Sequence, residues 1–234
     1  MDISTLDVAK LLTTNALLSA AAALVMVVAL CTRKTYPGFG FWTAGVAGLA
    51  LGAALMVPNL APLNAVTRTL RVAMLLGGML MILRGMLRFR GHRVGWWLEG
   101  LVALSFVTVF STIDANDFSM RQVIYGAYVC LLSLAIGFVT LYRRPAHFGS
   151  NDIMLVVWLC IYALLWLVRV IHELSETHQQ ATTTLEFIQR FGTFYAIAQI
   201  LTAQLVTLTL ISMNSQRIEF EYQTGEERLR EREE

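Results

Sequence analysis

Residues 191 to 213 read FGTFYAIAQILTAQLVTLTLISM, and residues 214 to 234 read NSQRIEFEYQTGEERLREREE. The first stretch carries no charged side chain and is long enough to cross about 30 Å of hydrocarbon as a helix. About half of the second is charged, yet it holds one Gly and no Pro, and no turn signal separates the two. We therefore expect a single helix that leaves a bilayer, continues into water and leads to a further domain downstream.

The composition is that of a protein that crosses a membrane several times. Hydrophobic residues make up 56% of the 234 residues and charged residues 15%, with a mean hydropathy of +0.61. A soluble domain usually carries about 25% charged residues. We expect an all-α bundle of seven transmembrane helices, in which the second and third are short, formed by residues 11–30, 41–57, 66–83, 94–113, 123–141, 153–171 and 191–213.

The placement of basic residues predicts the orientation. One set of connections holds twelve of them: Arg33, Lys34, Arg84, Arg88, Arg90, Arg93, Arg143, Arg144, Arg217, Arg228, Arg230 and Arg232. The opposite side has five, namely Lys10, Arg68, Arg71, Arg121 and Arg190. The first span is not a cleavable signal peptide, since the opening MDISTLD is acidic. We expect a multi-pass membrane protein with its amino terminus outside and its carboxyl terminus in the cytoplasm.

Catalytic and cofactor motifs are absent from the sequence. It contains no HExxH, no GxSxG and no Gly-rich phosphate loop. Its two lysines, Lys10 and Lys34, lie at membrane boundaries, so neither suits a retinal Schiff base. We expect no catalytic residue in this chain and no cofactor. A net charge of +2 gives no indication of a nucleic-acid partner.

Arginines at membrane depth are the first candidate site, because charges there are expensive. Arg68 and Arg71 lie one turn apart at the outer end of the third span. Arg169 lies near the outer end of the sixth, and Glu173 follows at i,i+4, where the two can pair. If these helices adjoin, the three guanidinium groups can hold the anionic head of an amphiphilic ligand. The alternative is that they pair with nearby acidic residues or reach lipid phosphates.

Two further groups of polar residues allow a functional and a structural interpretation. His172, Glu176 and His178 include an i,i+4 pair that can ligate a transition metal, although a solvated helix end explains them as well. Glu99 is a buried charge near the cytoplasmic side, and we expect Arg84 or Arg88 to pair with it across a helical hairpin.

Two domains follow from this pattern: residues 1–213 form the membrane domain, and residues 214–234 form a cytoplasmic helix. A heptad seam through the helix is weak and consists of Ile211, Ser215, Ile218, Tyr222 and Leu229. We expect this seam to pair with a second copy in a homodimer; the alternative is a solvated helix. Gly48 and Gly52 form a GxxxG motif in the second span, which suits either a contact within the bundle or a dimer contact.

Two segments carry a resemblance to a known family: RKTYPGFGFWTAGVAGLALG at residues 33–52 and LRGMLRFRG at residues 83–91. With the acidic opening and the exit helix, they resemble the multi-span amino-terminal region of bacterial membrane-bound GGDEF-type diguanylate cyclases and related sensor kinases. The resemblance implies a sensor in the bacterial inner membrane whose last helix drives an output domain, such as a cyclase that makes cyclic di-GMP. The alternatives are the sensor half of a histidine kinase and a small anion transporter or channel.

Overall fold

The computed structural model describes residues 3–57, 60, 65–92, 95–113, 118–142, 148–176 and 184–233. Within these ranges the chain is helical and contains no strand. The helices are α1 (Ile3–Thr32), α2 (Phe39–Ala54), α3 (Ala65–Phe89), α4 (Trp97–Ser111), α5 (Phe118–Leu141), α6 (Ser150–Glu176) and α7 (Thr184–Glu233). Side chains are described for most of these residues, but not for 176–196.

Each predicted apolar segment forms a helix, and five of the helices in the described part of the chain are long and apolar enough to cross a membrane. These are α1, α3, α5, α6 and α7, whereas α2 and α4 are shorter. The prediction that the third segment is short was wrong. It continues to Phe89 because arginine is a good helix former, so Arg84 and Arg88 do not end the helix. The fourth is shorter than predicted and begins only after Gly95.

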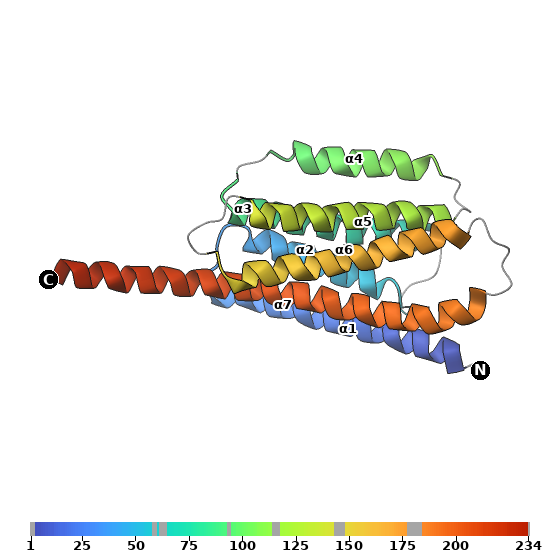
Figure 1. Cartoon of the computed structure of the whole chain (residues 1–234), viewed down its shortest axis with the longest axis horizontal. Helices are drawn as coiled ribbons and strands as arrows, with labels where there is room; N and C mark the ends of the chain where they lie inside the picture. Colours follow the sequence, from blue (N-terminus) through green and yellow to red (C-terminus); the bar gives the residue numbers. More distant parts are fainter. Residues whose placement is uncertain are drawn as a thin grey trace.

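The helices run up and down beside one another (Figure 1), and the contacts between neighbours close six of them into a ring. Around the ring the order is α1, α2, α3, α5, α6 and α7, with α7 packed against α1. Helix α4 lies outside the ring and packs loosely against α3 and α5. Its outward face is apolar and exposed, as expected for a helix that meets lipid rather than water.

Glycines bring α2 and α3 into close contact. A Cβ atom on Gly45 would lie only 2.7 Å from the carbonyl oxygen of Gly78, and one on Gly52 would meet the Leu75 side chain at the same distance. Small residues allow backbones to approach closely where lipid gives apolar faces no preference for one another. The GxxxG stripe is thus a contact within the bundle, one of the two alternatives that the sequence left open.

Helix α7 is held in the ring along its apolar half and then leaves it. Gln204 Nε2 donates a hydrogen bond of 3.3 Å to Ser19 Oγ of α1, a polar contact between two largely apolar helices. The hydroxyl of Thr202 donates to the carbonyl of Ala198 on the preceding turn, which satisfies it without another partner. At 1.5 Å per residue, the 50 residues of α7 span about 75 Å. Its charged end extends well beyond the other helices (Figure 1).

Candidate functional site

Three parts of the chain meet where α7 leaves the ring. The connection between α1 and α2 and the end of α3 both contact α7 there. We call this region the exit junction and define it by Tyr36, Phe89, Asn214 and Arg217. Met213 and Asn214 are buried, and Asn214 Oδ1 accepts a hydrogen bond of 3.2 Å from the backbone N–H of Tyr36. This bond satisfies a backbone donor that has been removed from water.

Arg217 joins all three parts of the exit junction. Its guanidinium carbon lies 4.1 Å from the ring centroid of Tyr36 and 5.1 Å from that of Phe89. Its Nη1 donates to the carbonyl oxygen of Phe89 at 3.1 Å, and the Tyr36 hydroxyl donates to the carbonyl oxygen of Arg217 at 3.4 Å. Arginine suits this position because its planar cation stacks on aromatic faces and still donates hydrogen bonds from its edge. The contact holds the first turn of α7 beyond the ring in one rotational setting.

The sequence YPGFGFW explains why the α1–α2 connection lies against α3. Gly38 has φ +110°, a conformation that other residues rarely adopt, and a Cβ atom there would collide with the carbonyl of Gly85. Phe39 and Trp42 are fully buried, and Trp42 packs on Phe89 with a centroid distance of 4.9 Å. These residues therefore fix the position from which Tyr36 contacts α7.

Charged contacts surround the exit junction. Lys34 Nζ lies 3.1 Å from Glu221 Oε2, in a pair whose side chains are 68% and 44% exposed, so it contributes little. Burial, together with the Glu221 carboxylate, raises the pKa of Tyr36 to about 12, so its hydroxyl remains a hydrogen-bond donor at any physiological pH. Arg90 at the end of α3 forms a buried ion pair with Asp152 at the start of α6. The same end of the bundle thus links α1, α2, α3, α6 and α7.

The exit junction includes residues that the sequence did not reveal. Asn214 of the junction, and Asp152 near it, have no periodic or motif signal that distinguishes them from ordinary helix-end polar residues. The Asp152 carboxylate accepts from the N–H of Gly149 at 2.8 Å, a contact typical of an acidic residue in the first turn of a helix. Its ion pair with Arg90 joins residues 62 positions apart and has no local signal.

The outer arginines form the second candidate site. The condition that the third and sixth helices adjoin is not met, because α5 lies between them. Arg71 nevertheless lies within electrostatic range of Arg68, of Arg169 and of Tyr125 of α5. Arg169 Nε lies 3.8 Å from Glu173 Oε1, the predicted i,i+4 pair. We call Arg68, Arg71, Arg169 and Glu173 the outer arginine cluster.

The surroundings of this cluster are partly apolar. The guanidinium of Arg169 lies 5.5 Å from the ring of Trp166, and Tyr125 packs edge-on against the same ring at 5.2 Å. Arg71 Nε is buried and has no hydrogen-bond partner among the described residues. A buried donor without a partner is costly, so an anionic group at this position would be stabilised.

Two further predicted groups are the buried charge Glu99 and the possible metal ligands His172, Glu176 and His178. Glu99 is paired with Arg84, one of the two arginines expected, with Oε1 3.0 Å from Nη1, and the same nitrogen donates to the carbonyl of Gly95 at 3.2 Å. His172 is half-buried, whereas the side chain of Glu176 and all of His178 lie outside the described residues, so the metal hypothesis is not tested. Among the described side chains, no group of three His, Cys, Asp or Glu residues could hold a metal ion.

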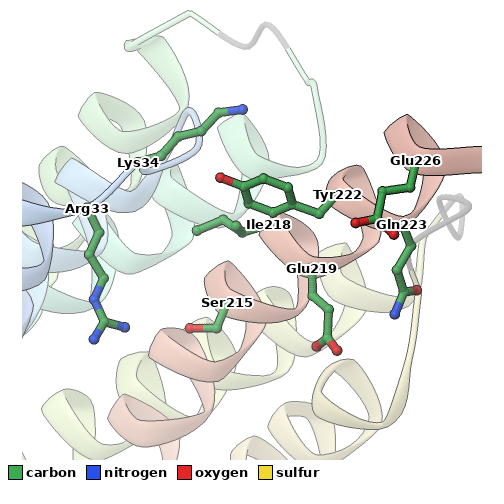
Figure 2. A pocket seen from close by; sticks show the side chains of 8 residues that line it. All are labelled: Arg33, Lys34, Ser215, Ile218, Glu219, Tyr222, Gln223 and Glu226. Carbon is green, nitrogen blue, oxygen red and sulfur yellow. The ribbon is translucent and has the colours of Figure 1, made fainter. Parts of the chain in front are cut away.

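A groove follows the predicted seam on α7. Ile211 and Ile218 pack against the core, Ser215 and Tyr222 are exposed, and the side chain of Leu229 lies outside the described residues. The groove has a volume of about 500 Å³ and is lined by Arg33, Lys34, Ser215, Ile218, Glu219, Tyr222, Gln223 and Glu226. Figure 2 shows the two basic side chains on the α1–α2 connection and the other six on α7. We call this surface the exit groove.

Comparison with protein-family models, with curated proteins and with solved structures finds no match to this chain. The likeness to GGDEF-associated sensor regions therefore rests on the quoted residues alone.

Proposed function

We propose that this chain is the membrane input module of a bacterial signalling protein, which converts a membrane or periplasmic cue into movement of α7. The observation that carries the proposal is the path of α7. It is one helix over 50 residues, it packs in the ring along its apolar half, and it continues beyond the ring past the exit junction. A helix without a break transmits rotation or displacement along its length.

The exit junction supplies the coupling in this proposal. Arg217 and Asn214 of α7 contact Tyr36 and Phe89, so a shift of the α1–α2 connection or of α3 changes the contacts that set the rotation of α7. A cue acts by stabilising one of two settings of these contacts. In the proposed protein the receiver is a cytoplasmic output domain, such as a diguanylate cyclase that makes cyclic di-GMP or a histidine kinase.

The outer arginine cluster is the proposed receptor site. It combines guanidinium donors with the aromatic surfaces of Trp166 and Tyr125 at the end of the ring opposite the exit junction, a chemistry that suits an amphiphile with an acidic head. A small anion transporter is the second candidate function, favoured by the same cluster. Flux of anions into proteoliposomes would support the transporter, and an absence of flux together with ligand binding would support the sensor.

The receptor role predicts a specific loss of binding. Arg169→Ala removes one guanidinium from the cluster, and we expect it to weaken binding of a long-chain fatty acid such as oleate by about 2 kcal/mol. Thermal unfolding in detergent with and without oleate measures the change. Arg121→Ala is the matched control. Arg121 lies one turn before Tyr125 on α5, but its guanidinium donates to the Ile113 carbonyl. Equal oleate-induced shifts in wild type and Arg169→Ala would leave Arg169 as a structural partner of Glu173 only.

Dimerisation through the seam is tested by cysteine crosslinking in a background that lacks Cys31, Cys130 and Cys160. We expect single cysteines at Ser215, Ile218, Tyr222 and Leu229 to crosslink two copies more efficiently than cysteines at Gln216 or Glu227, since seam positions face the partner. Gln216 is a well-matched control, because its side chain lies against Gly149 of its own chain. Uniform crosslinking along the segment would indicate a flexible tether.

A further inference from the structure

The exit groove has two oppositely charged edges. Arg33 and Lys34 on the α1–α2 connection form the basic edge, and Glu219 and Glu226 on α7 form the acidic edge. The two glutamates are seven residues apart, so they lie on the same face of the helix. Between the edges lie Ile218 and the ring of Tyr222, which is 71% exposed.

We propose that the exit groove is filled by α7 of a second copy, with Arg33 and Lys34 of each copy contacting Glu219 and Glu226 of the other. The inference rests on the proposed dimer and adds its contacts: the α1–α2 connection, and not α7 alone, forms the interface. It links the dimer contact to the exit junction, because Lys34 lies two residues before Tyr36.

Symmetry makes this arrangement consistent. Two copies in one membrane are related by a two-fold axis along the membrane normal, which leaves the depth of every residue unchanged. Arg33 and Lys34 line the same groove as Glu219 and Glu226, so they lie at a similar depth. The two-fold rotation therefore places the basic edge of each copy at the same depth as the acidic edge of the other. Two equivalent contacts form in this way. The Lys34–Glu221 pair within one chain is exposed, so its exchange for a contact between chains costs little.

The chemistry of the groove favours a second helix over a lipid surface. Anionic head groups would be attracted by Arg33 and Lys34 but repelled by Glu219 and Glu226. Ser215, Ile218 and Tyr222 follow the spacing of three and four residues by which one helix contacts another. In a second copy, the glutamates of α7 meet the basic edge, and its Arg33 and Lys34 meet the acidic edge, so both edges are complemented.

The test uses two populations of the protein, each with a different affinity tag and without its native cysteines. One carries Arg33→Cys and the other Glu226→Cys, and both are reconstituted together and exposed to a short bifunctional maleimide. We expect a product that carries both tags, which only a contact between chains can give. The control pairs Arg33→Cys with Gln216→Cys, and we expect little product, because Gln216 lies against Gly149 of its own chain.

Charge reversal gives a second measurement. Arg33→Glu with Lys34→Glu should weaken dimerisation about tenfold at low salt, as should Glu219→Arg with Glu226→Arg, and combining all four should restore it.

If Tyr222→Cys crosslinks to itself while the mixed pair does not and charge reversal has no effect, the dimer stands and this inference is overturned. If neither crosslink forms, both the dimer and the inference fail. Binding to anionic vesicles that depends on Arg33 in a monomeric protein would identify a lipid surface as the occupant and also overturn the inference.

Discussion

Arg84 and Arg90 are buried in ion pairs, although the sequence suggests that they lie in an exposed connection. Both were counted among the basic residues of a cytoplasmic connection, yet their side chains are only 2% and 1% exposed and are paired with Glu99 and Asp152. Acidic residues contribute little to topology, so the pairing does not weaken the predicted orientation. It gives these two arginines a second role, because each ties α3 to a neighbouring segment.

The Arg84–Glu99 pair predicts a strong difference between single and double substitutions. Glu99→Leu leaves a buried guanidinium without its counter-charge, and we expect it to lower the free energy of unfolding by about 3–5 kcal/mol. The double variant Arg84→Met with Glu99→Leu should cost clearly less. Unfolding in detergent micelles measures both, and Glu221→Gln, which removes an exposed pair, is the control with an expected effect below about 1 kcal/mol. A double variant as unstable as Glu99→Leu would show that the pair acts through packing alone.

At the scale of elements, the sequence predicts which segments are helical but not which helices are neighbours. The length of an apolar run indicates a helix directly, and all seven runs are helical. The sequence does not indicate which helices are neighbours, because lipid and the protein interior are equally apolar and an apolar helix face suits either. Nothing in residues 66–83 or 153–171 indicates that α5 lies between α3 and α6. Likewise, the Asn214–Tyr36 contact joins residues 178 positions apart.

Helix α4 provides the sharpest test of the span count. Its 15 residues extend about 22 Å, less than the roughly 30 Å of hydrocarbon, and it lies outside the ring. If it spans nevertheless, reporter fusions at Gly91 and after Glu234 should indicate cytoplasm, and a fusion at Asp117, which lies outside the described residues, should indicate periplasm. Reporters at Gly91 and Asp117 on the same side would show that α4 does not cross and that the seven-span topology is wrong.

At the scale of the whole molecule, the two candidate sites lie at opposite ends of the ring. The outer arginine cluster is built from the start of α3 and the end of α6, and the exit junction from the end of α3 and the outer part of α7. Helix α3 is common to both, and α6 packs against α7. We therefore propose that a ligand at one end alters the contacts of α7 at the other through helices that are packed along their length.

The proposed signalling requires α7 to act as a rigid connection, and an insertion experiment measures this most directly. One residue inserted after Glu226, beyond the contacts of Arg217 with Tyr36 and Phe89, rotates everything downstream by about 100°, whereas seven residues restore the rotation almost fully. With a GGDEF catalytic domain joined after Glu234, cellular cyclic di-GMP is the output. We predict that the single insertion locks or abolishes output and that the seven-residue insertion largely preserves it; output that is unchanged by the single insertion would contradict the account.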